Sequence, residues 1–215
     1  MSFEPKNLFI LLALIVWVAN SRRFENWLPY LGLWLTLSMA TEIIGDLTAC
    51  SKFSNYIYYN IFIVVDFILM SSILFKINPK RKESIWIFAC SALIVLISAI
   101  AFLFNNSPIQ DFATSVLLVM GGLLVVHSTV VILRLAMYST TPILKSPEFW
   151  IALSPFFYFA CFVPSFGMSM YFSETNRDLA EQLYKINDYL FVLRYLLILM
   201  GLILAFKKPV NAPRL

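Results

Sequence analysis

Five side chains that can carry a charge lie inside long apolar stretches of this sequence. They are Glu42, Asp46, Asp66, His127 and Arg194. An ionised group near the centre of a bilayer costs about 2.5 to 3.5 kcal/mol on insertion scales, so each of them must meet a partner or water. A guanidinium is the favoured buried partner of a carboxylate, because its fork donates two parallel hydrogen bonds. The chemistry to expect here is charge pairing, ligand or ion binding, or proton transfer.

Helical spacing brings these side chains onto three polar faces. The faces are Ser38, Glu42 and Asp46; Tyr59 and Asp66; and Tyr184, Asn187 and Arg194. Residues three, four or seven apart share a helix face, so with all three faces turned inward Arg194 bridges Asp66 or Glu42. One carboxylate then lacks a counter-charge, and it is either protonated or balanced by a bound cation or basic ligand. We predict a ligand- or ion-binding site made by Glu42, Asp66, Arg194, Tyr59 and Asp46. A hydrogen-bonded cluster that only fixes helix packing is the alternative.

Two further features concern protons and movement. His127 is the only histidine, and it is either a packing residue with satisfied hydrogen bonds or a proton relay. Pro155, Pro164 and Gly167 lie in an otherwise uncharged apolar run. Each proline removes a backbone hydrogen bond and clashes with the preceding turn, so this helix should bend. The bend is either a gating kink or a static one.

Several well-known kinds of catalytic and metal site are excluded by the sequence. With one histidine and no cysteine pair, the sequence cannot assemble a His-rich zinc hydrolase site. No Ser-His-Asp grouping, Walker loop or glycine-rich dinucleotide turn is present in the sequence. We therefore assign no catalytic residue, no metal ion and no cofactor, and an intramembrane lipid enzyme is only a second alternative for the function.

The composition predicts the elements that position these residues. The chain has 215 residues, of which 60% are hydrophobic and 13% charged, whereas ordinary soluble domains have about 45 to 50% and about 25%. The mean hydropathy is +0.81. This excess excludes a soluble globular domain, a disordered chain and a nucleic-acid binder. It predicts an all-α polytopic membrane protein with one transmembrane domain, residues 1–215.

Seven apolar runs are candidates for helices that cross about 30 Å of hydrocarbon. They are predicted at about residues 5–20, 27–47, 56–75, 84–104, 108–134, 147–172 and 176–206. The last of them includes an amphipathic segment, 175–188, which is either an extension of the helix above the membrane or an interfacial helix leading into it. The third and seventh helices should stop at Asn78-Pro79 and Lys208-Pro209, and Ser146-Pro147-Glu148 should start the sixth.

The lysines and arginines predict one orientation in the membrane. Eleven of the sixteen lie in the segments on one side, four lie in the segments on the other side, and Arg194 lies within a helix. Because cytoplasmic loops are enriched in Lys and Arg, we predict the N-terminus outside and the C-terminus inside. We expect the bacterial inner (plasma) membrane as the location. The net charge of +4 then reflects topology, with no need for a nucleic-acid partner.

Two features in particular carry a resemblance to other membrane proteins. Glu42 in the second of seven helices, and Ser146-Pro147-Glu148-Phe149-Trp150-Ile151 leading into an aromatic sixth helix, resemble a group of small uncharacterised seven-helix bacterial inner-membrane proteins. The resemblance covers most of the chain and implies no function.

The function we expect is that of a sensor or receptor-like module with an outward-facing polar cavity. A secondary transporter or channel for a small cation or metabolite is the alternative. The expected partners are the lipid bilayer, a small ligand or ion, and a separate signalling protein, because the chain has no output domain of its own.

Overall fold

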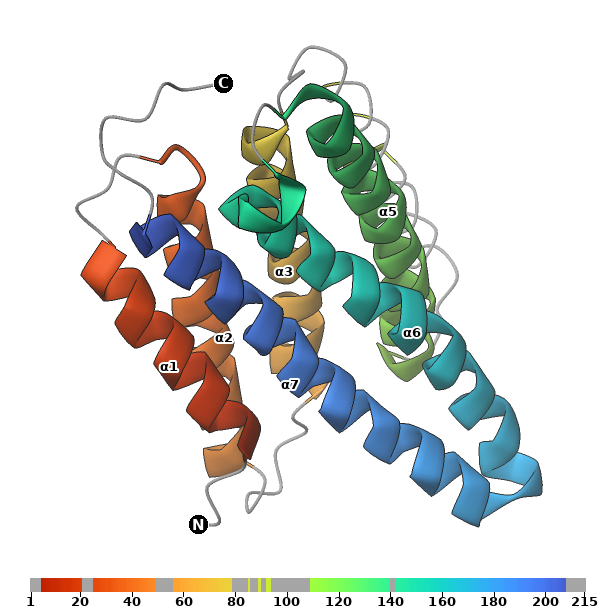
Figure 1. Ribbon diagram of the computed structural model, residues 1–215. Coiled ribbons are helices and arrows are strands. Elements are labelled where there is room, and N and C mark those ends of the chain that lie inside the picture. The colour runs from red at the N-terminus through yellow and green to blue at the C-terminus, as the bar shows by residue number, and fades with distance from the viewer. Residues whose placement is uncertain are drawn as a thin grey trace.

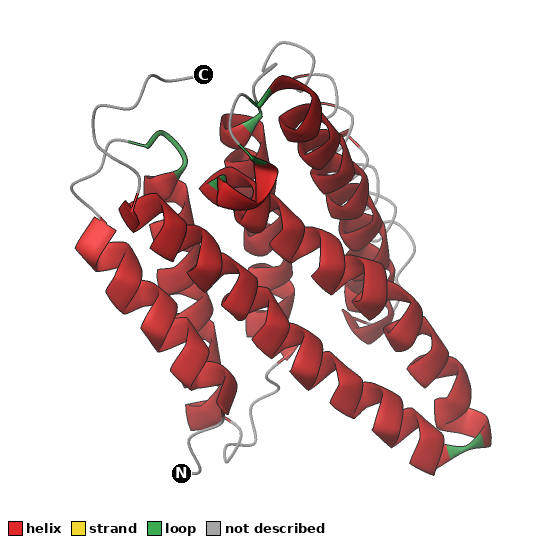
Figure 2. Ribbon diagram, viewed as in Figure 1, coloured by secondary structure: helices red, strands yellow, loops and turns green. Residues whose placement is uncertain are grey.

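The computed structural model describes residues 5–20, 25–48, 56–78, 109–139 and 142–207, together with four isolated residues, Ile85, Ala89, Ala92 and Leu93. Every regular element within these residues is helical (Figure 2). The elements are α1 (Pro5–Asn20), α2 (Leu28–Thr48), α3 (Tyr56–Ile77), α5 (Ile109–Tyr138), a short 3₁₀ helix η1 (Ile143–Lys145), α6 (Pro147–Thr175) and α7 (Arg177–Lys207). The predicted all-helical class is confirmed for the described residues. Apart from those four residues, the predicted helix 84–104 lies outside them.

The ends of the helices follow signals in the sequence. α3 ends at Ile77, directly before Asn78-Pro79, and α7 ends at Lys207, directly before Lys208-Pro209. A residue that precedes proline disfavours the helical conformation. α6 begins with Pro147 at its first position, where no backbone N–H is needed. Ser146 is the N-cap residue of α6, but its side chain makes no capping hydrogen bond to the helix backbone, because its Oγ donates to the Glu148 carboxylate at 2.5 Å. A carboxylate is the stronger acceptor.

Three of the described helices are long and apolar enough to cross a membrane. They are Leu117–Tyr138, Pro147–Ser173 and Arg177–Lys207. α7 is one uninterrupted helix of 31 residues. The amphipathic segment is therefore an extension of this helix from Arg177 onward, and the alternative of a separate interfacial helix is wrong.

Figure 1 shows how the helices are arranged. α6 and α7 form an antiparallel hairpin whose closed end stands away from the other helices, and α7 lies between α1 and α6. α5 packs against α6, and α3 packs against both α2 and α5. α1, α3, α5 and α7 run in one direction, while α2 and α6 run in the other. The fully buried core between them includes Leu35, Met70, Ile73, Ile151 and Ile198.

The predicted kink residues lie inside a continuous helix. Pro155 and Pro164 are both within α6, which runs without a break for 29 residues. A Cβ added at Gly167 would meet no atom within 4 Å, so this glycine is not required for packing. A gating role for these three residues stays a prediction, because it concerns movement.

The glycine pair in α5 allows a close approach of α6 at one of its two positions. A Cβ added at Gly121 would lie 2.9 Å from the side chains of both Phe159 and Val163. A Cβ added at Gly122 would meet no atom within 4 Å. Small residues permit such close helix contacts in membranes, and Gly121 makes one with α6.

We expect Gly121→Ala to destabilise the protein by about 1 to 3 kcal/mol, because the added methyl group forces α5 and α6 apart. Gly122→Ala is the matched control and should leave stability unchanged or slightly raised, since alanine has the higher helix propensity. Thermal unfolding of both variants in detergent, followed by circular dichroism, measures the difference. Equal unfolding midpoints would contradict the close contact.

Candidate functional site

An ion pair between Arg194 and Asp66 joins α7 to α3. Nη2 of Arg194 lies 2.8 Å from Oδ1 of Asp66. Both residues are buried, with 3% and 6% of their surface exposed. The sequence predicted that Arg194 pairs with either Asp66 or Glu42, and in the structure its partner is Asp66. An ion pair this deeply buried is screened little by solvent, and losing either member leaves the other charge uncompensated.

A tryptophan of α2 completes the ion pair, although sequence reasoning did not identify it. Nε1 of Trp34 donates a hydrogen bond to the same Asp66 Oδ1 at 2.5 Å, and Trp34 is fully buried. One carboxylate oxygen therefore accepts hydrogen bonds from α2 and from α7. Trp34 precedes Ser38 by four residues and Glu42 by eight, so its position on the polar face of α2 was a signal that could have found it.

Aromatic rings enclose the guanidinium of Arg194. Its Cζ lies 4.8 Å from the ring centroids of Trp34 and Tyr158 and 5.3 Å from that of Phe159. Tyr195 stacks on Trp34, with ring centroids 5.4 Å apart and an angle of 23° between the rings. Cation–π contacts of this kind contribute about 2 kcal/mol or more when they are desolvated. We call Asp66 and these four aromatic residues the arginine box.

The backbone of α7 is also held at this point. Oγ of Ser154 on α6 donates a hydrogen bond to the carbonyl oxygen of Arg194 at 3.1 Å. Nε of Arg194 is buried and has no hydrogen-bond partner among the described residues. Asp66 and the aromatic rings thus hold the guanidinium in place, while its Nε donor is left without a hydrogen bond among the described residues.

Glu42 lies beside the arginine box. It is 7% exposed, and it is close enough to the hydroxyl groups of Tyr158 and Tyr195 to interact with both electrostatically. The described part of the site therefore holds two buried acids, Glu42 and Asp66, and one buried guanidinium. The predicted need for a bound cation, a basic ligand or a protonated carboxylate beside them stays a prediction.

Of the remaining predicted site residues, Asp46 and His127 have described side chains and Tyr59 does not. Asp46 is half-buried and accepts a hydrogen bond from Nδ2 of Asn7 on α1, at 3.5 Å. The backbone of Tyr59 is in α3, but its side chain lies outside the described residues. His127 on α5 is 1% exposed, and its Nε2 has no partner within the described ranges. Its predicted role as a proton relay stays a prediction.

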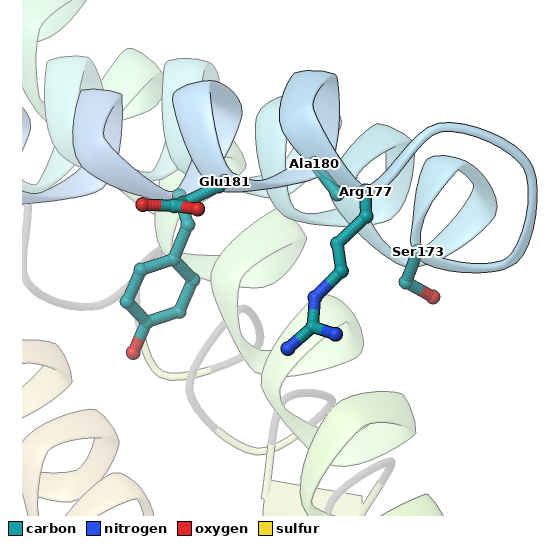
Figure 3. Close-up of a pocket in the computed structure, with 5 residues that line it drawn as sticks. Ser173, Arg177, Ala180 and Glu181 are labelled. Carbon is teal, nitrogen blue, oxygen red and sulfur yellow. The ribbon is translucent and has the colours of Figure 1, made fainter.

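A pocket that is open to the surface lies at the closed end of the α6–α7 hairpin. It has a volume of about 510 Å³ and is lined by Ser173, Arg177, Ala180, Glu181 and Tyr184. Figure 3 shows the Arg177 side chain extended from α7, with Ser173 on the neighbouring end of α6. Around Arg194, three aromatic rings lie against the guanidinium, and the predicted outward-facing polar cavity stays a prediction.

The search for metal-binding groups among the described residues and the comparison with known proteins both gave no result. Within the described ranges, no group of three or more His, Cys, Asp or Glu side chains is placed to hold a metal ion. A comparison with protein-family models, with curated proteins and with solved structures finds no match to this chain. The geometry of the buried site is therefore what bears on function.

Proposed function

We propose that this chain is a seven-helix protein of the bacterial inner membrane and acts as a sensor or receptor-like module. Its N-terminus lies outside and its C-terminus inside. α3 and α5 run in the same direction (Figure 1), which favours one more crossing between them, the predicted helix 84–104.

The positions of basic residues on the described helices support this orientation. Lys76, Lys145 and Lys207 lie in the last turns of α3, η1 and α7. Arg177 and Lys185 lie near the beginning of α7, at the opposite end of that helix from Lys207. The end that carries the first group is the cytoplasmic one under the positive-inside rule.

One observation carries the sensor proposal: Trp34 and Arg194 share a single oxygen of Asp66. α2, α3 and α7 meet at this atom, and α6 joins them through its rings and through Ser154. A ligand that changes the charge of Asp66, or displaces either donor, alters the packing of all these helices together. Such a difference in contacts between two states is what a ligand needs in order to shift a conformational equilibrium.

Thermal unfolding of the protein in lipid nanodiscs tests this proposal. We expect at least one compound in a panel of small amines, amino acids and inorganic cations to raise the unfolding midpoint of the wild type. The compound should have no such effect on Asp66→Asn or Arg194→Lys, and it should not be transported. If both variants unfold at lower temperature yet keep every ligand response, the arginine box only fixes the packing of the helices.

Transport of a small cation or metabolite is the second candidate function. The observation that favours it is the presence of two buried acids, Glu42 on α2 and Asp66 on α3. Acidic side chains inside membrane helices commonly form the proton relays of pumps and transporters. We then expect cation uptake into proteoliposomes to respond to a pH gradient and to disappear in Asp66→Asn. Uptake that is unchanged in this variant would exclude the carboxylate mechanism.

A further inference from the structure

One face of α7 carries a row of polar side chains from the cavity to the buried ion pair. Arg177, Tyr184, Asn187 and Arg194 follow one another at intervals of seven, three and seven residues, so they share this face. The first two line the cavity at the closed end of the hairpin. Exposure falls along the row, from 61% at Tyr184 to 8% at Asn187 and 3% at Arg194.

Asn187 is the member of this row that the rest of the structure does not explain. It is buried, yet neither its Nδ2 nor its Oδ1 has a hydrogen-bond partner among the described residues. A buried polar group without a partner costs roughly 1 to 3 kcal/mol, and ordered water commonly satisfies such groups. Nε of Arg194, two turns further along α7, is in the same condition. Two unsatisfied polar groups on one helix face point to water beside α7.

An aromatic ring separates these two groups. Phe191 follows Asn187 by four residues and precedes Arg194 by three, on the same face of α7. Its ring centroid lies 5.0 Å from that of Tyr195 and 6.2 Å from that of Tyr158, two rings of the arginine box. An apolar constriction of this kind excludes water and ions until it moves.

We propose that the α6–α7 hairpin contains a water-filled vestibule that leads from its cavity to Asn187 and is closed by the ring of Phe191. The vestibule admits water as far as Asn187, and movement of the Phe191 ring would extend it to the ion pair of Arg194 and Asp66. It gives the proposed sensor or transporter a route of access to its ion pair. The inference rests on the membrane-spanning part of the proposed function and on neither of the two activities.

Cysteine labelling tests whether the vestibule contains water. Cys50, Cys90 and Cys161 are first replaced by serine, and single cysteines are then added to the protein in nanodiscs, where both membrane faces are open. A cationic methanethiosulfonate reagent reacts with thiols that are ionised in water. We expect Asn187→Cys to react at least ten times faster than Ile198→Cys, which is fully buried further along α7. Equal rates, or a slower reaction at position 187, would overturn the vestibule.

A buried reporter tests the closure by Phe191. Ser38 on α2 is 1% exposed and lies beside Tyr195, so Ser38→Cys should react slowly in the otherwise unchanged chain. Adding Phe191→Ala should raise its rate at least tenfold, and Phe191→Leu should raise it less. The control is Leu193→Ala, which removes an exposed side chain from the other side of α7.

The result that overturns the closure is an unchanged rate in Phe191→Ala, or an equal increase in Leu193→Ala. A single elution peak for each variant establishes that its fold is kept. Labelling does not depend on ligand response or flux. If labelling fails while a ligand still stabilises the wild type, the vestibule is wrong and the sensor proposal stands.

Discussion

Replacing Asp66 by leucine alone should lower the free energy of unfolding by about 3 to 5 kcal/mol, because Arg194 is then buried without a counter-charge. Arg194→Met should cost a similar amount for the converse reason. The double variant should recover a large part of this loss, since apolar side chains then replace both buried charges. A double-mutant cycle on unfolding in detergent measures the coupling energy between the two residues.

The exposed ion pair on α7 provides the matched control. Nζ of Lys185 lies 3.2 Å from Oε1 of Glu181, and about two thirds of each side chain is exposed. Glu181→Leu should change stability by no more than about 1 kcal/mol, because solvent already screens this pair. If the losses in the two buried single variants simply add in the double variant, Asp66 and Arg194 are not coupled and the arginine box is wrong.

Trp34→Ala should be as damaging as the loss of a buried charge, at about 3 to 5 kcal/mol. It empties a fully buried site that holds a ring against Arg194 and Tyr195. Trp34→Phe keeps most of the ring and removes the hydrogen bond to Asp66, so we expect a loss of about 1 to 3 kcal/mol. Thermal unfolding of the two variants in detergent separates packing from hydrogen bonding.

Trp150→Phe is the control, because it removes an indole hydrogen bond at a different site. Nε1 of Trp150 donates a hydrogen bond to the carbonyl oxygen of Leu144 at 2.9 Å, at a site open to solvent. Its loss should be small, because water replaces the partner. Equal losses in Trp34→Phe and Trp150→Phe would show that the bond to Asp66 contributes nothing specific.

Helix positions were predictable because their signals are local. Proline after Asn78 and after Lys208 marks where α3 and α7 end, and α1 has the predicted bounds, 5–20. Other helices continue past their apolar runs, as α5 does to Tyr138 and α6 to Thr175. Hydropathy marks the segment that fits the hydrocarbon, whereas a helix continues for as long as its backbone hydrogen bonds do.

Only the charged residues of the site could be predicted from the sequence, because few residues can balance a buried charge. Arg194 in an apolar helix needs an acid, and Asp66 was one of two at a suitable depth. Tyr158 and Phe159 could not be identified, because the chain contains 20 Phe, 10 Tyr and 5 Trp residues. Which of these rings contacts the guanidinium depends on how α6 is rotated about its axis, and no local pattern encodes that rotation.

Because α7 is continuous, a tilt of the helix at one end displaces the residues at its other end. Arg177 at the cavity and Arg194 in the arginine box are separated by about 25 Å of one unbroken helix. A tilt of a few degrees imposed at the closed end of the hairpin displaces the guanidinium by roughly 1 to 2 Å, the size of the helix shifts that switch many proteins. A tilt of α7 would therefore change the distance between Arg194 and Asp66, which are 2.8 Å apart in this structure.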